Sequence, residues 1–479
     1  MIAFIIILFV VLAFLLYLFI KMNIAASKAP KLQEGKNYYS EEEINKYAQD
    51  LGKMIRCKTV SVKDSYEDSE FKKLRETVEE LFPLFHKRAE KLTFSEDCWI
   101  YKIEGKNKNH NIMLMSHHDV VDVSGEWEHD GFSGEIADGK IWGRGTVDTK
   151  TPLFAEFSAL EELLEEGFEF PCNVYIGSSH NEELGGNGIP EANKYFKENQ
   201  ITFDVILDEG GALIEPPIAG IKAEKCAMIA VHEKGRYYLN CKATAANAHA
   251  SLTAAGGATV VERMSAFIDE VTKKDLFIRR LNPQVRAMFS HLAPYCSFPM
   301  KLLFTNLEVF GGLLKKVMPK INAQAGGLIG TTCSFNKIEG SSEDKVCSAR
   351  AFLRPVDEKD FEKDLQKFIE VAKKYAIEVE VDESSEYHAP ADMSKPQFDY
   401  LKKCVNEIFP QYPVSPFILP AGTDARTLTD VCPCVLRFAP IRLSAQQLAS
   451  VHAENENIDL DAVANCVKFY KHFVKNYKV

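Results

Sequence analysis

Histidine and acidic residues follow directly after several short apolar runs of this 479-residue chain. The first run ends in Ser116-His117-His118-Asp119, where His117 and Asp119 are two positions apart and so share one face of a strand. This pairing suits an imidazole that binds a metal ion while a carboxylate orients the ring. Later candidates of the same kind are Asp148, Glu182, Glu183, Asp208 and His452. Together these side chains could bind divalent ions and transfer protons.

The carboxyl ends of parallel strands lie at one edge of an α/β sheet, so these residues are expected to meet in one cleft. Carboxylates crowded into such a cleft would repel one another and take up protons unless cations compensate them. If Asp148, Glu183 and Asp208 are ligands, two divalent ions leave one net positive charge, which favours a bound hydroxide. The mixture of imidazole and carboxylate predicts two Zn²⁺ per chain, with Co²⁺ or Mn²⁺ as alternatives, and one further glutamate as general base.

Six motifs follow one another along the chain. They are His117-x-Asp119-Val120-Val121, Gly143-Arg144-Gly145-x-x-Asp148, Glu182-Glu183-x-Gly185-Gly186, Asp208-Glu209-Gly210-Gly211, Gly422-Thr423-Asp424-x-Arg426 and His452-x-x-Asn455-Glu456. In this order they resemble the aminoacylase-1 and carboxypeptidase S family of dinuclear zinc peptidases. The resemblance covers about residues 40–479 and implies a hydrolase that cleaves a peptide or amide bond.

The resemblance also implies a role for each residue of the site. Asp148 would bridge both metal ions, Glu183 and His452 would complete one metal site, and His117 and Asp208 would complete the other. Asp119 would orient His117. Glu182 would take a proton from the attacking water and pass it to the leaving amine.

Candidate substrate contacts lie in two other segments. Gly422, Thr423 and Arg426 belong to the fifth motif. His249 resembles the family's histidine that reaches a partner subunit's active site and binds the oxyanion. Taken without the family, His249 is instead a strand-end histidine with a satisfied hydrogen bond.

Two segments depart from the family pattern. Ile329-Gly330-Thr331-Thr332 stands where relatives often carry Arg-Thr-Thr, and Lys345-Val346-Cys347-Ser348 stands where they carry Asn-Val-x-Pro. Those family residues commonly hold the substrate carboxylate or complete the oxyanion site, so the substrate class is affected and the metal centre is not. Arg426, with Arg350 or Arg354 as alternatives, is expected to supply a replacement guanidinium.

The elements that must position these residues form an α/β pattern. Continuous apolar runs alternate with helices, which predicts a doubly wound, mostly parallel sheet covered on both faces, formed by residues 38–232 and 389–479. A capping pattern from Ser40 to Glu43 predicts a helix that runs to about residue 57. Residues 233–388 read as β-α-β-β-α-β, an inserted α+β (ferredoxin-like) domain with a helical excursion near 275–325. The resemblance implies that this insert is a lid and a dimerisation domain, through which a homodimer would form.

Residues 1–20 are uninterrupted apolar residues, which predicts a transmembrane anchor followed by a linker over 21–37. Lysines occur only after this segment, which places the catalytic body in the cytoplasm by the positive-inside rule; an extracytoplasmic body is the alternative. The formal net charge of −11 argues against nucleic-acid binding. The 12 cysteines are dispersed, as in proteins of a reducing compartment.

These patterns predict a membrane-anchored zinc hydrolase acting on short peptides or N-acyl amino acids. The departures described above motivate an alternative, a non-catalytic metal- and ligand-binding protein on the same scaffold. A dehydrogenase is a poor third choice, because no GxGxxG leads from a strand into a helix.

Overall fold

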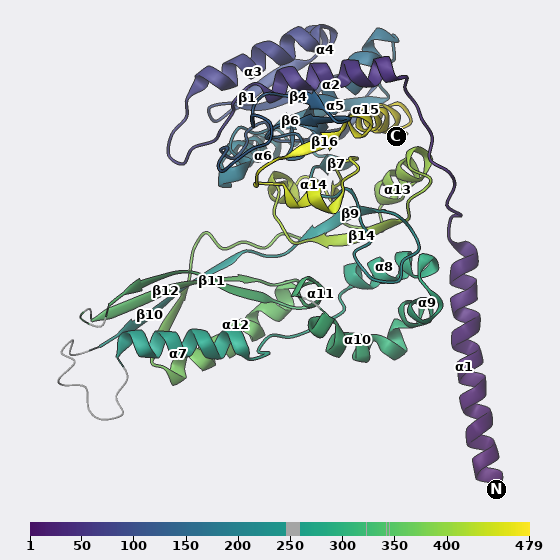
Figure 1. Cartoon of the computed structure of the whole chain (residues 1–479), viewed down its shortest axis with the longest axis vertical. Coiled ribbons are helices and arrows are strands. Elements are labelled where there is room, and N and C mark those ends of the chain that lie inside the picture. The colour runs from purple at the N-terminus through teal and green to yellow at the C-terminus, as the bar shows by residue number, and fades with distance from the viewer. Residues whose placement is uncertain (246–258, 322, 342, 344) are drawn as a thin grey trace. The chain divides into compact units, whose positions relative to one another are not determined.

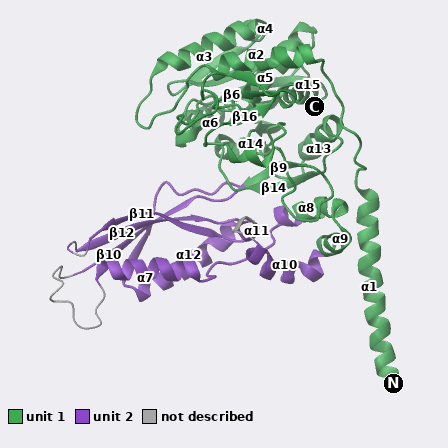
Figure 2. Cartoon of the chain, viewed as in Figure 1, with its two compact units in different colours: residues 1–232, 287–305, 390–479 green, residues 233–286, 306–389 purple. Residues whose placement is uncertain are grey.

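The computed structural model describes residues 1–245, 259–321, 323–341, 343 and 345–479. These residues form two compact units (Figure 2): unit 1 comprises residues 1–232, 287–305 and 390–479, and unit 2 comprises residues 233–286 and 306–389. The predicted limits of the catalytic and inserted domains stay predictions, because compactness alone does not assign a domain its role.

A nine-stranded mixed sheet forms the centre of unit 1, in the order β1-β2-β6-β3-β7-β15-β9-β14 with β8 paired to β9 (Figure 1). Its strands are β1 (Glu90–Phe94), β2 (Cys98–Ile103), β3 (Asn107–Met115), β6 (Cys172–Ser178), β7 (Val205–Asp208), β8 (Leu213–Ile214), β9 (Cys226–Glu233), β14 (Val414–Leu419) and β15 (Val435–Arg437). The strands β6, β3, β7 and β15 are parallel neighbours, whereas β1, β2 and β9 pair antiparallel. The prediction of a mostly parallel sheet therefore overestimated the share of parallel strands, since these form only the middle of the sheet.

Helices cover this sheet and pack against it in the core of unit 1. They are α2 (Glu41–Ile55), α3 (Asp68–Leu81), α4 (Pro83–Arg88), α5 (Lys150–Glu165), α6 (Gly188–Glu198), α9 (Phe298–Thr305), α13 (Pro396–Ile408), α14 (Ala445–Ala449) and α15 (Leu460–Lys475), with α8 (Pro283–Leu292) spanning the limit of the two units. The helices α2, α5 and α15 pack against one another (Figure 1). The predicted capping box of α2 is confirmed, because Ser40 and Glu43 bond reciprocally.

A small three-stranded sheet connects two loops that matter for the site. It consists of β4 (Glu135–Ala137), β5 (Lys140–Trp142) and β16 (Asn457–Asp459), in the order β16-β5-β4. The pairing of Asn457 with Trp142 brings the chain after His452 next to the chain before Asp148. Two residues that are 304 positions apart in the sequence are thereby placed on neighbouring loops.

The N-terminal helix α1 (Ile2–Lys28) is, among the described residues, the one helix long and apolar enough to cross a membrane. Its length and composition fit both a membrane anchor and a signal sequence, and they leave the topology open. Most of its side chains are exposed, whereas Leu18 and Met22 are buried. Near its end, the ring of Phe19 lies 6.3 Å from that of Phe298 at the start of α9.

Unit 2 contains a four-stranded antiparallel sheet in the order β11-β12-β10-β13. Its elements are β10 (Tyr237–Thr244), α7 (Val260–Lys273), α10 (Leu307–Ile321), α11 (Ala323–Gly327), β11 (Thr332–Gly340), β12 (Val346–Arg354), α12 (Glu358–Lys374) and β13 (Ile377–Val381). The helices α7 and α12 pack on the sheet around Phe267 and Phe368. The predicted helical excursion near 275–325 is confirmed by α8, α9 and α10, whereas the lid role and the ferredoxin-like assignment stay predictions.

Candidate metal centre

The ends of three parallel neighbours, β6, β3 and β7, carry most of the candidate residues. His117 lies two positions after β3, and Glu182 and Glu183 form a 3₁₀ turn four positions after β6. Asp208 ends β7, and Glu209 follows it. Because parallel strands end at the same edge, the sheet brings these side chains together, as the strand-end argument predicted.

One cluster consists of Asp148, Glu183 and His452, whose ligand atoms all lie within 4.8 Å of one another. The Nε2 atom of His452 is 2.9 Å from Glu183 Oε2 and 3.1 Å from Asp148 Oδ2. Hydrogen bonds to these two carboxylates raise the pKa of His452 to about 10. The other carboxylate oxygen of Glu183 is buried and has no hydrogen-bond partner within the described part of the chain. A buried oxygen without a donor is an environment that a cation would stabilise.

A second cluster consists of His117, Asp148 and Glu209, again with ligand atoms within 4.8 Å. His117 Nε2 is 3.0 Å from Asp148 Oδ1, and its Nδ1 is 3.0 Å from the Asp119 carbonyl oxygen. Asp148 therefore directs one carboxylate oxygen to each imidazole and belongs to both clusters. Burial opposes the ionisation of Asp148, but hydrogen bonds from the two imidazoles outweigh it and hold its pKa below the ordinary value.

Glu209 stands in this second cluster, whereas the sequence analysis expected Asp208, so the choice between these two neighbouring carboxylates stays a prediction. Asp208 lines the same small cavity, but its oxygens accept hydrogen bonds from the backbone N–H groups of Glu209, at 2.9 Å, and Ala425, at 3.0 Å. Burial, together with the charge of Asp424, raises the pKa of Asp208 to about 6. Burial raises the pKa of Glu209 well above its usual value as well. Both carboxylates lie beside His117, since Asp208 and Glu209 line the same small cavity.

Asp119 connects the first strand end to the glutamate pair. Its carboxylate oxygens accept hydrogen bonds from the backbone N–H groups of Glu182, at 3.1 Å, and of Glu183, at 3.2 Å. The Asp119 carboxylate also lies 3.3 Å from His117 Nδ1, so it fixes the ring and the turn together. Glu182 lines the small cavity beside His117, and burial raises the pKa of Glu182 well above its usual value.

The loop that carries Asp148 is held by a buried carboxylate to which the sequence analysis assigned no role. Glu456 accepts hydrogen bonds from the backbone N–H groups of Gly145, Val147 and Asp148, at 2.7–3.2 Å. Its other oxygen is 2.5 Å from Arg144 Nη1. Both partners belong to the quoted motifs, so their joint presence was the signal that could have identified this pair.

The candidate substrate contacts are not members of the two metal-ligand clusters. Arg426 Nη1 donates to the Thr423 carbonyl at 2.6 Å, and the Thr423 hydroxyl accepts from Arg437 Nε at 3.4 Å. Gly422 begins this turn. The alternatives Arg350 and Arg354 lie on β12 of unit 2. His249 lies outside the described residues.

Comparisons with known proteins identify the family of this chain. The family model described as "Peptidase family M20/M25/M40" matches residues 113–476. The "Probable carboxypeptidase S-like 2" of Dictyostelium discoideum is 29% identical over 90% of this chain and 84% of its own. The "N-fatty-acyl-amino acid synthase/hydrolase PM20D1" of Xenopus tropicalis is 25% identical over 91% and 87%. The crystal structure of the M20 family metallo-carboxypeptidase Sso-CP2 from Sulfolobus solfataricus superposes with a TM-score of 0.64, at 19% identity, over 91% of this chain and 99% of that one.

The family match spans more than half of the chain, and the resemblance to carboxypeptidase S relatives is confirmed. The protein therefore belongs to peptidase family M20/M25/M40 and is a hydrolase.

Proposed function

We propose that this protein is a membrane-anchored dinuclear zinc hydrolase that cleaves an amide bond in short peptides or N-acyl amino acids. The observation that carries the proposal is the pair of metal-ligand clusters that share Asp148. Two imidazoles and three carboxylates, one of them common to both clusters, are a donor set that suits two divalent ions of borderline hardness.

The proposed ligands are His117, Asp148 and Glu209 for one ion and Asp148, Glu183 and His452 for the other. The unpartnered buried oxygen of Glu183 supports this assignment, because it lacks any donor that would compensate its charge. The raised pKa values of Asp208 and Glu209 support it too, since burial above all, and neighbouring carboxylates as well, disfavour the ionised forms that a cation would stabilise. Sso-CP2, which shares this fold, is named a metallo-carboxypeptidase, and that name favours the same conclusion.

The metal ions would supply Lewis acidity toward the substrate carbonyl and the attacking water. Glu182 would accept the proton of that water and deliver it to the leaving amine nitrogen, as a general base and then a general acid. Its place in the cavity beside His117 supports this role. Asp119 would keep the His117 ring in position and fix the backbone of the Glu182 turn.

The names of the relatives suggest two substrate classes. One relative is described as carboxypeptidase S-like and another as an N-fatty-acyl-amino acid synthase/hydrolase. In both classes the scissile amide nitrogen belongs to an amino acid that carries a free carboxylate. We therefore propose a substrate with that C-terminal amino acid and leave the acyl side, peptide or fatty acid, to the assay.

The remaining parts of the proposal concern the outer segments. We propose that α1 is the anchor, supported by its length and apolar composition, and that the body faces the cytoplasm. Residues 233–388 are proposed as a lid through which a homodimer forms, a role carried over from the family resemblance.

The test uses the full chain in detergent, assayed for metal content and for hydrolysis of dipeptides and N-acyl amino acids. Glu182→Gln should lower turnover by about 10²- to 10⁴-fold while metal content stays near two ions per chain. Glu198→Gln, on the exposed end of α6, is the matched control and should retain activity. Full activity of the Glu182→Gln variant would refute the mechanism. A wild-type chain that binds metal but hydrolyses no substrate of the panel would favour the non-catalytic alternative.

A further inference from the structure

An exposed apolar stripe runs along α10 in unit 2. Its members recur every four residues and therefore lie on one face of the helix. They are Val309, Leu313, Val317 and Ile321, which are 41%, 54%, 40% and 64% exposed. A neighbouring face of the helix is buried, through Leu314 and Met318. The stripe is thus not needed to attach α10, and its exposure to water is unfavourable unless something covers it.

A basic groove of about 670 Å³ opens on the same helix. Its lining includes Lys315, Lys316 and Lys320 of α10, and Arg279 with Asp275 from the preceding segment. Arg279 Nη2 lies 2.5 Å from Asp275 Oδ1, so these two charges compensate each other. The three lysines remain as a local positive charge on a chain whose formal net charge is −11.

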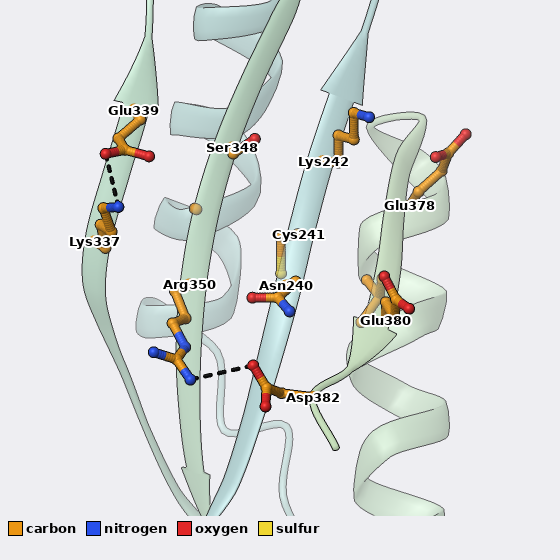
Figure 3. A pocket seen from close by; sticks show the side chains of 12 residues that line it. Asn240, Cys241, Lys242, Lys337, Glu339, Ser348, Arg350, Glu378, Glu380 and Asp382 are labelled. Carbon is orange, nitrogen blue, oxygen red and sulfur yellow. Dashed lines mark hydrogen bonds and ion pairs between the residues drawn. The ribbon is translucent and has the colours of Figure 1, made fainter. Parts of the chain in front are cut away.

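The other large hollow described in unit 2 has no such excess of positive charge. That hollow, on the sheet face drawn in Figure 3, is lined by three basic and four acidic side chains. Two of its basic side chains pair within it, because Lys337 bonds Glu339 at 2.7 Å and Arg350 bonds Asp382 at 3.2 Å (Figure 3). The formal charge of its lining is −1, whereas the lining of the α10 groove is positive.

An apolar stripe beside lysines has the chemistry of a helix that lies in the surface of an anionic bilayer, with side chains among the lipids and ammonium groups near the phosphates. The same chain carries α1, which is long and apolar enough to cross a membrane. A bilayer anchored at one end of the chain would be present at high local concentration for the rest of it. A soluble acidic protein would match the lysines but would not be held near the stripe.

We propose that the α10 face, defined as Val309, Leu313, Val317 and Ile321 with Lys316 and Lys320, docks onto an anionic phospholipid bilayer. This inference goes beyond the hydrolytic activity and uses only the anchoring part of the proposed function. Docking would orient unit 2 on the membrane that holds α1. It would also favour substrates that partition into the bilayer.

The test places a reporter on the stripe of the full chain. Leu313→Cys is labelled with an environment-sensitive dye, and the chain is reconstituted into phosphatidylcholine vesicles with or without phosphatidylserine. Gln366→Cys, exposed on α12 of the same unit, is the matched control. The unsubstituted chain, in which Cys333 is half-buried and the other cysteines are buried, sets the labelling background. Nitroxide-bearing lipids report contact with the bilayer, and aqueous iodide reports exposure to water.

We expect nitroxide lipids to quench the Leu313→Cys label, more strongly with phosphatidylserine, and to leave the Gln366→Cys label unaffected. Combining Lys316→Glu and Lys320→Glu should reduce the preference for anionic lipid by about 30-fold. Equal quenching at both positions would overturn the proposal. Protection from iodide without quenching by lipid would overturn it as well, because a protein would then cover the stripe.

A second readout separates this proposal from the anchor. Washing the vesicles with alkaline carbonate removes a chain that α1 does not anchor. Removal of the chain from the vesicles would contradict the proposal that α1 is an anchor. Lipid quenching of the Leu313→Cys and Gln366→Cys labels, measured after vesicles are added to the chain, would still decide whether α10 docks. The Val317→Cys label repeats the measurement if the Leu313→Cys variant folds poorly.

Discussion

The buried pair of Arg144 and Glu456 is the part of the site whose removal has the most definite structural consequence. Glu456 is fully buried, and Arg144 is 2% exposed. All four groups that bond the Glu456 carboxylate are donors, namely Arg144 and the backbone N–H groups of Gly145, Val147 and Asp148. Burial raises the pKa of Glu456, whereas Arg144 and the Val147 amide lower it. Four donors can be satisfied only by the ionised carboxylate, since a protonated one would itself need an acceptor.

Glu456→Gln keeps the shape of the side chain and removes its charge. A glutamine has one acceptor oxygen and one NH₂ group that only donates. In either orientation the NH₂ group meets a donor, either Arg144 or the backbone N–H groups. The variant therefore leaves a buried guanidinium or a set of amides without an acceptor, at a cost of about 3–5 kcal/mol. The affected loop carries Asp148, which both metal-ligand clusters share.

Hydrogen exchange measures this cost where it arises. In the peptide that covers Gly145 to Asp148, a loss of about 3–5 kcal/mol should speed amide exchange by about 10²- to 10³-fold or more. Metal affinity should fall by about 10- to 100-fold, because Asp148 is no longer held in place. Glu454→Gln is the matched control, since Glu454 lies two residues away and is exposed. If Glu456→Gln exchanges no faster than this control, Glu456 does not hold the loop.

Three further outcomes follow from the site and the core. The imidazole of His452, whose pKa is about 10, is protonated at pH 7, so metal uptake should release protons and weaken as the pH falls. Calorimetry in buffers of different ionisation enthalpy measures the number of protons released. Metal uptake without proton release would contradict this prediction. Elemental analysis should find about one metal ion per chain in Glu209→Gln and about two in Asp208→Asn. The reverse pattern would show that Asp208 is the ligand. Phe267→Ala should lower the stability of unit 2, measured by hydrogen exchange, by about 3–5 kcal/mol, because the Phe267 ring packs 5.2 Å from that of Phe368. A loss of stability below about 1 kcal/mol would mean that the core closes around the cavity.

The strand ends near the site could be predicted from the sequence, because each apolar run is followed by histidine or acidic residues. The runs that end before His117, Glu182 and Asp208 correspond to β3, β6 and β7, which are parallel neighbours. The antiparallel strands on either side were not predicted. Residues 226–233 form β9, a run that is buried throughout and carries no periodicity that separates a strand from a helix.

The choice between Asp208 and Glu209 could not be made from the sequence. Both are acidic, both follow the same apolar run, and the motif contains both. Both line the cavity beside His117, and the groups that surround each of them depend on how β7 lies beside β3 and β15. The backbone N–H of Ala425, which donates a hydrogen bond to the Asp208 carboxylate, comes from a segment more than 200 residues away in the chain. Only the tertiary structure brings these groups together.

The proposed metal ligands and the proposed substrate contacts are placed by different physical means in this chain. The metal-ligand candidates of β3, β6 and β7 lie at or shortly after strand ends, which the hydrogen bonds of the sheet hold fixed. Arg426, in contrast, donates to Thr423 within its own turn, so it stiffens that turn as well as lying near the site. Turns and loops tolerate substitution better than strand ends do. If residues 329–332 contact the substrate, as the family resemblance implies, substitutions there would change the substrate while the proposed hydrolytic centre stays the same.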